Sequence, residues 1–226
     1  MKKISAILLA GGSGSRFGGE RNKVYEDLGG KPVLLWSLDV LLAHPAVSEV
    51  VIAVRKGEEE GAAEVLGAAE NHAAKPVFSV FGGITRTASV HNALDRTKGE
   101  IVLVHDGARP FLRREDIDAC IGAMEDVPGA AIAVPLIDTI KRADEEGRVI
   151  ETIPRDGIWA MKTPQCFRRK EFAEAMLWYG EELGLTDDCM LMERAGYPVR
   201  LLCGSSRNIK ITTREDLAVA EALLKQ

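Results

Sequence analysis

The chain has 226 residues, of which 46% are hydrophobic and 28% charged, and its formal net charge is -5. This balance is typical of a folded globular protein and excludes a disordered chain. The acidic net charge argues against nonspecific nucleic-acid binding, which needs a basic surface, but Lys and Arg side chains can still gather around one anionic ligand.

The first segment, MKKISAILLA, combines two lysines with an apolar run. That run is at the short limit for a signal peptide, and GGSGSR follows it where a cleavage site would stand, so a buried parallel strand explains it better. No stretch approaches the length of a membrane span, and we expect no membrane partner. Four widely spaced cysteines without a CxxC pair argue against structural zinc and favour a reduced, cytoplasmic protein.

Strand-like and helix-like segments alternate along the chain. Short runs rich in Val and Ile predict strands at residues 4–10, 50–54, 77–80, 101–105 and 130–135. Three- and four-residue apolar spacing predicts helices at residues 33–43, 58–69, 86–94 and 114–124, and a last helix over 213–224 begins at Thr212 or Thr213 as its cap. This order predicts an α/β fold, one doubly wound domain over residues 1–226 with a mainly parallel sheet.

Residues 136–159 do not follow this alternation of strands and helices. Alternating residues flank the turn-forming ADEEG, which predicts a β-hairpin. The segment is too polar for a central strand, so we expect it to project from the domain as an arm. On pattern alone, a surface hairpin without a function is the first interpretation.

The segment LLAGGSGSRFGGERNK follows the first strand. Its glycines permit a tight turn whose N–H groups can hold phosphate oxygens, and Arg16 and Lys23 add positive charge. A flexible Gly/Ser turn would have the same composition. The Walker A sequence Gly-Lys-Ser/Thr is absent. A dinucleotide fingerprint is weakened because its third glycine comes one residue late, at Gly18, and no acid follows Val54.

A second signal is VLVHDGARPF, residues 102–111. Asp106 ends an apolar strand, and open α/β sheets bind ligands at that edge. A carboxylate there is suited to Mg²⁺, which prefers oxygen ligands and bridges phosphates. Arg109 would face a second anionic group. The structural alternative is that Asp106 caps the turn and Arg109 pairs with it.

The glycine-rich segment, together with the lysine before KPVLLWSL, resembles the nucleotidyltransferase superfamily, whose fold is Rossmann-like. Further blocks follow in order: FGGITRTASVHNAL, HDGARP, VPLIDTIKR, IPRDGIWAMKTPQCF, LTDDCMLMERAG and GSSRNIKITTREDL. Together they resemble the 2-C-methyl-D-erythritol 4-phosphate cytidylyltransferase family from residue 4 to about residue 224. The family also occurs fused to a cyclase, and with one helix after Lys210 we expect no such domain here.

The resemblance implies a role for each matching residue. Arg16 and Lys23 match the transition-state stabilisers, Asp106 the Mg²⁺ ligand, and Arg155 and Lys210 the groups that orient the attacking phosphate. The residues implied to bind the nucleotide are Ala10, Gly11, Gly12, Ser13, Gly14, Gly83, Ser89, Asp106 and Gly107. Those implied to bind the sugar-alcohol phosphate are Arg109, Thr139, Arg155, Thr163, Thr186, Asp187 and Lys210.

The resemblance also implies a homodimer in which the arm crosses to the second subunit and Arg155 acts there. This replaces the interpretation of residues 136–159 as a hairpin without a function. The reaction it implies joins CTP to 2-C-methyl-D-erythritol 4-phosphate and releases pyrophosphate. A cytidylyltransferase for another polyol phosphate, such as ribitol 5-phosphate, is the nearest alternative, and a noncatalytic nucleotide-binding module is a remote one. A dehydrogenase is weaker still.

Structural interpretations remain for several of these positions. Arg86 would be an ordinary first-turn helix residue, Thr186 with Asp187 a helix cap, and Thr163 with Pro164 the end of a strand. Lys210 stands between Ile209 and Ile211 in an alternating pattern, as on a strand. Three positions depart from the family: Asn22 and Val24 flank the first lysine in place of Pro and Gln, and Arg207 stands where an acid is common, which puts a second metal carboxylate in doubt.

Overall fold

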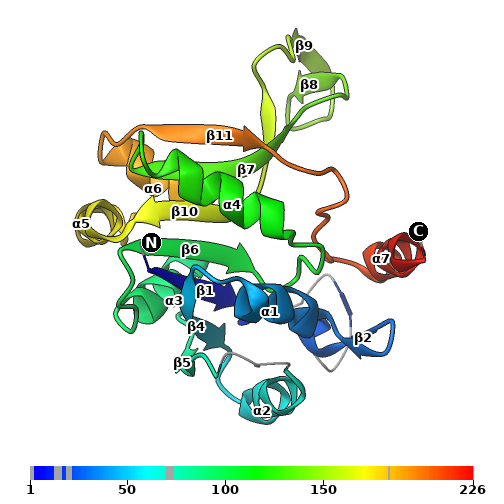
Figure 1. Ribbon diagram of the computed structural model, residues 1–226. Coiled ribbons are helices and arrows are strands. Elements are labelled where there is room, and N and C mark those ends of the chain that lie inside the picture. Colours follow the sequence, from blue (N-terminus) through cyan, green and yellow to red (C-terminus); the bar gives the residue numbers. More distant parts are fainter. Residues whose placement is uncertain (1–2, 13–16, 19–21, 70–73, 183, 226) are drawn as a thin grey trace.

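Seven strands form one sheet in the computed structural model, which describes residues 3–12, 17–18, 22–69, 74–182 and 184–225. Figure 1 shows the strands in the order β11-β7-β10-β6-β1-β4-β5. Strand β10 runs antiparallel to β6 and β7, whereas the other pairs are parallel. The mainly parallel sheet is therefore confirmed. The strands are β1 (Ile4–Leu9), β4 (Val47–Val54), β5 (Val77–Phe81), β6 (Ile101–Asp106), β7 (Gly129–Pro135), β10 (Trp159–Arg168) and β11 (Val199–Cys203).

Helices cover both faces of this sheet (Figure 1). The cluster on one face contains residues of α1 (Val33–Ala43), α2 (Glu59–Ala68) and α4 (Arg114–Ala123). The cluster on the other contains residues of α3 (Arg86–Leu94), α5 (Arg169–Tyr179) and α6 (Asp188–Arg194). Strand β1 shows why its sequence is apolar throughout: Leu8 packs into the first cluster and Ile7 into the second. A strand buried on both faces has no polar side.

The elements predicted up to residue 135 agree with the structure within three residues. Helices α1 and α3 have the predicted bounds, and β4 begins three residues earlier than expected. The last helix, α7 (Arg214–Leu224), begins after Thr213, whose side chain accepts from the Asp216 N–H at 3.3 Å. Thr213, and not Thr212, is therefore the cap. A short hairpin of β2 (Asp27–Leu28) and β3 (Lys31–Pro32) lies beside α7 (Figure 1).

Between residues 159 and 203, α5 and β11 were not predicted, whereas β10 and α6 were anticipated only as a strand ending at Thr163 and Pro164 and a helix capped by Thr186 and Asp187. The expectation that Thr163 and Pro164 end a strand is wrong, because both lie inside β10. The ladder to β7 shifts register between Met161 and Gln165, so Pro164 fills no paired position there. A proline without an N–H is thus accommodated in the middle of a sheet.

The projecting hairpin is confirmed. Strands β8 (Ile140–Ala143) and β9 (Val149–Ile153) pair with each other in antiparallel fashion. They follow β7 and precede β10 in the chain and extend away from the main sheet (Figure 1). Its turn is held by the Asp144 carboxylate, which accepts from the Arg148 N–H at 2.8 Å, and Gly147 supplies a positive φ of 81°. In the described part of the chain, no helix is long and apolar enough to cross a membrane.

Candidate active site

A cavity of about 520 Å³ opens where β1 and β6 end. This is the carboxyl edge of the parallel strands, where open α/β sheets bind ligands. Seven residues predicted for the site line it: Gly11, Gly12, Lys23, Gly83, Ser89, Asp106 and Lys210. Residues far apart in the sequence therefore meet at one place.

Asn22 shapes the wall that follows β1. Its side-chain amide donates to the carbonyls of Ala10 at 2.9 Å and Gly12 at 3.1 Å, and to the Glu58 carboxylate at 2.9 Å. It thereby ties the two ends of the glycine-rich segment together and places Lys23, the first residue of the short helix η1 (Lys23–Tyr25), beside the cavity. Ala10 is buried behind this wall. Ser13, Gly14 and Arg16, which were also predicted for the site, lie outside the described residues.

The opposite wall is the turn before α3. The Ser89 hydroxyl accepts from the Gly83 N–H at 3.0 Å and donates to the Thr85 carbonyl at 2.9 Å. A Cβ on Gly83 would collide with the Cβ of Ala88, so only glycine fits this approach. The Thr85 side chain caps α3 by accepting from the Ala88 N–H at 3.0 Å. These contacts fix Gly83 and Ser89 as a rigid edge of the cavity.

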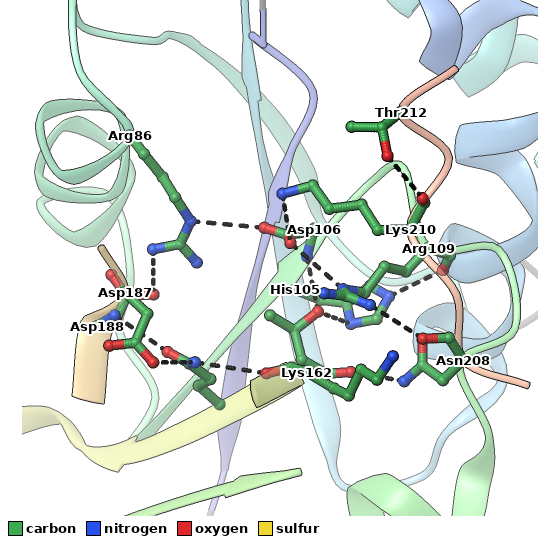
Figure 2. A network of polar contacts seen from close by, with 12 residues as sticks. Arg86, His105, Asp106, Arg109, Lys162, Asp187, Asp188, Asn208, Lys210 and Thr212 are labelled. Atoms are coloured by element: carbon green, nitrogen blue, oxygen red, sulfur yellow. Dashed lines mark hydrogen bonds and ion pairs between the residues drawn. The ribbon is translucent and has the colours of Figure 1, made fainter. Parts of the chain in front are cut away.

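Asp106 lies between three cations, as Figure 2 shows. Its Oδ2 is 3.0 Å from Lys210 Nζ and 3.4 Å from Arg109 Nε, and its Oδ1 is 3.5 Å from Arg86 Nε. Burial raises the pKa of this carboxyl, but Arg86, Lys210 and Arg109 outweigh burial and hold the pKa well below its usual range. Asp106 is thus a carboxylate at any pH near neutral, and the cluster around it carries a net positive charge.

Arg86 has a second partner, the buried carboxylate of Asp188 at the start of α6, 2.8 Å from its Nη1. Burial disfavours the charge on Arg86, but Asp188 and Asp106 reverse this and raise its pKa. The Asp188 N–H donates to the Gln165 side chain at 3.1 Å. The sequence interpretation treated Arg86 as an ordinary helix residue, yet it lines the cavity.

His105 and Thr163 fix the backbone at Asp106. The Thr163 hydroxyl accepts from the Asp106 N–H at 3.1 Å and lies 2.9 Å from His105 Nδ1, while His105 Nε2 lies 3.1 Å from the Arg109 carbonyl. A carbonyl only accepts, so Nε2 carries the hydrogen and Nδ1 accepts from Thr163. Complete burial lowers the pKa of His105 to about 4, which keeps the ring neutral.

Lys210 does not lie on a strand, contrary to the alternating pattern around it. Its segment lies against the loop that follows β6, because the Ile211 N–H donates to the Ala108 carbonyl at 2.8 Å. Ile211 is fully buried and anchors the segment. Arg207, the departure from the family pattern, donates to the Leu223 carbonyl of α7 at 2.7 Å and does not line the cavity.

Other residues predicted for the site do not line this cavity. Arg109 is buried, and its Nη1 donates to the Asn208 carbonyl at 2.9 Å. Its Nε lies 3.4 Å from Asp106, which is the pairing that the structural alternative predicted. Gly107 is packed against Leu9, whose carbonyl would lie 2.8 Å from a Cβ at that position.

Asp187 is confirmed as a helix cap: one oxygen accepts from the Met190 N–H and the other from Gln165. Thr186 precedes it and is exposed. Thr139 and Arg155 lie exposed on the arm, where Arg155 donates to the Ile137 carbonyl. The substrate roles of these residues stay predictions.

Comparisons with known proteins agree on one family. The profile of the family described as "IspD: 2-C-methyl-D-erythritol 4-phosphate cytidylyltransferase" matches residues 4–226. A relative of that name from Pelotomaculum thermopropionicum is 41% identical over 232 residues, which cover 100% of this chain and 95% of the relative. One from Alkaliphilus metalliredigens is 39% identical over 231 residues, which cover 99% and 94%.

Solved structures agree with these sequence relatives. A crystal structure of 4-diphosphocytidyl-2C-methyl-D-erythritol synthase from Anaerococcus prevotii has a TM-score of 0.86 and 31% identity, with 100% of this chain and 99% of that chain covered. The 2-C-methyl-D-erythritol 4-phosphate cytidylyltransferase from Thermus thermophilus has a TM-score of 0.79 and 30% identity, with 99% and 100% covered. This chain belongs to the 2-C-methyl-D-erythritol 4-phosphate cytidylyltransferase family.

Proposed function

We propose that this chain transfers CMP from CTP to the phosphate of 2-C-methyl-D-erythritol 4-phosphate and releases pyrophosphate. Membership of the family supports this reaction. The main structural support for this reaction is the cavity, which is lined by three cations, Lys23, Arg86 and Lys210, and by the carboxylate of Asp106. A cavity of this charge suits a triphosphate together with a second phosphate. Family membership favours the methylerythritol acceptor over ribitol 5-phosphate, and an enzyme over a noncatalytic module.

The proposed chemistry needs no general base. The acceptor phosphate is already a nucleophile near neutral pH and attacks the α-phosphate of CTP in line, while pyrophosphate leaves. Arg16 and Lys23 would stabilise the charge that grows at the α-phosphate, and Lys210 would orient the attacking phosphate. Positioning and fixed positive charge then account for catalysis. Gly83 and Ser89, at the rigid edge before α3, would bind the cytosine and ribose.

Asp106 is suited to one divalent cation. It lines the cavity and is ionised, and Mg²⁺ commonly uses one or two carboxylates together with substrate phosphates. The described residues hold no group of three or more metal-binding side chains, so nucleotide phosphates would complete the coordination. When bound, Mg²⁺ would neutralise charge on the departing pyrophosphate.

We also propose a homodimer formed through the arm. Three apolar side chains on or beside it are more than half exposed: Ile137 (78%), Val149 (61%) and Ile150 (60%). Exposed apolar groups gathered on a projecting hairpin support contact with a second copy of the chain. Arg155 at its base would then reach the acceptor phosphate of the partner's cavity. Sedimentation of the full chain and of a Val149→Ser/Ile150→Ser variant tests this, and a wild-type monomer at micromolar concentration would contradict it.

The central experiment follows pyrophosphate release from CTP with each of several polyol phosphates. We expect turnover with 2-C-methyl-D-erythritol 4-phosphate and little with ribitol 5-phosphate. Lys23→Ala should lower turnover by about 10²–10³-fold, the usual loss for one electrostatic stabiliser. The Lys170→Ala variant, altered on α5 away from the cavity, is the control. CTP binding without turnover of any acceptor would refute the proposal.

A further inference from the structure

We propose that Lys210 holds the place of the divalent cation on Asp106 while the site is empty, and leaves that carboxylate when metal and nucleotide bind. The inference rests on the proposed function for its ligands, and it assigns Lys210 two positions instead of one. Its starting point is the crowding at Asp106. One carboxylate serves three cations at 3.0, 3.4 and 3.5 Å, so a divalent ion would add two charges to a group that is already positive.

Two of the three cations are anchored elsewhere. Arg86 is held 2.8 Å from the buried carboxylate of Asp188, whose own N–H is bound to Gln165. Arg109 is buried, and its Nη1 donates to the Asn208 carbonyl at 2.9 Å. Moving either guanidinium would leave a buried partner without its charge or its donor, which is costly in a site of low dielectric.

Lys210 differs from both. Its side chain is 40% exposed, compared with 27% for Arg86 and 10% for Arg109. Within the described residues, Asp106 is the one acid that pairs with it. The backbone beneath it is fixed by buried Ile211 and by the Thr212 hydroxyl, which donates to the Lys210 carbonyl at 3.1 Å (Figure 2). The flexible side chain can therefore turn while its attachment stays in place.

Replacement of the Lys210 ammonium by a metal ion leaves both Asp106 and Lys210 with a partner of opposite charge. Without metal, the ammonium lies 3.0 Å from Oδ2 of Asp106, nearer than either guanidinium group. When a divalent cation takes Oδ2, the ammonium is free to bind the incoming phosphate, the role that Lys210 has in the proposed reaction. Arg86 and Arg109 keep the carboxylate oriented throughout. Lys210 thus couples occupation of the metal position to readiness for the acceptor.

The test measures binding of Mn²⁺ alone, without nucleotide, from the EPR signal of the free ion. Lys210→Met should bind Mn²⁺ at least about tenfold more tightly than the wild type, because the competing ammonium group, 3.0 Å from Oδ2 of Asp106, is removed. Lys210→Arg should bind it no more tightly than the wild type. Asp106→Asn should abolish the gain when it is combined with Lys210→Met. The folding of each variant, the double variant included, can be checked by circular dichroism.

Lys162→Met is the matched control. Lys162 lies on β10, and burial, together with the charge of Arg109, lowers its pKa. It forms no ion pair with Asp106 among the described residues. Equal tightening by Lys162→Met would show a general field effect and overturn the inference, as would unchanged affinity in Lys210→Met. Neither result depends on turnover. Failure of the pyrophosphate assay would therefore refute the proposed reaction and leave the Mn²⁺ comparison standing.

Discussion

Replacing Asp106 by Asn tests whether this carboxylate supports the fold as well as the site. The substitution removes the negative charge that faces Arg86, Arg109 and Lys210. Lys210 can turn to solvent and Arg86 keeps Asp188, so the loss falls mainly on Arg109, whose side chain is only 10% exposed. Leaving one member of a buried pair alone costs about 3–5 kcal/mol. We expect the lower end, about 3 kcal/mol of unfolding free energy, because Arg109 keeps its bond to a carbonyl.

Urea unfolding at pH 7 measures this loss, with Asp126→Asn as the control. Asp126 pairs with Arg200 at 2.8 Å, but its side chain is 64% exposed, and such pairs contribute about 0–1 kcal/mol. The pKa of Asp106 is lowered on folding, so its stabilisation is complete above the unfolded pKa of about 4 and is lost progressively as pH falls from there through the lowered pKa of the folded state. The difference between wild type and Asp106→Asn should therefore shrink in acid. Equal stability at pH 7 would refute the electrostatic account of the cluster.

Three further predictions concern other parts of the fold. Gly83→Ala should raise the KM for CTP by about tenfold or more, because the new Cβ displaces α3 at Ala88; an unchanged KM would remove Gly83 from the nucleotide site. Thr213→Ala should cost about 1 kcal/mol in urea unfolding, as a lost cap does, whereas no loss would contradict the observed capping box. A thiol reagent should modify one cysteine of the folded chain, Cys203, and four in denaturant, since the other three are buried; early reaction of a second thiol would contradict that burial.

Position along one strand was predictable, and contact between distant segments was not. Asp106 could be assigned to the ligand edge because an apolar run ends on a carboxylate, which fixes its place on a parallel sheet. Arg86 could not be assigned, because its orientation depends on Asp188, about a hundred residues further along the chain, and no sequence pattern showed that the two meet. Asn22 was likewise noticed only as a neighbour of Lys23, although it ties the glycine-rich segment together.

Alternation misled at Lys210 for a related reason. A period of two describes an extended chain, but a strand also needs a partner along its length. The Ile209 N–H instead bonds back to the Arg207 carbonyl at 2.7 Å. Here the Ile211 N–H finds the Ala108 carbonyl, and the segment then crosses the sheet edge toward α7. The opposite error occurred at β10, where Pro164 suggested an end, yet a register shift let the strand continue. The alternation of apolar residues indicates only the local backbone conformation, whereas the pairing of strands depends on the rest of the fold.

The net charge of the chain also does not predict the charge at the ligand cavity. The chain carries -5 overall, which taken alone would suggest repulsion of a nucleoside triphosphate. The charged residues that line the cavity are Lys23, Arg55, Arg86 and Lys210 with the single carboxylate of Asp106, so four positive charges less one negative charge leave +3. Interactions with exposed charges fade beyond a Debye length of about 8 Å, so a phosphate inside the cavity responds to this local excess. The fold thus gathers cations from four places at one sheet edge of an acidic protein: η1, the residue after β4, the start of α3 and the segment before α7.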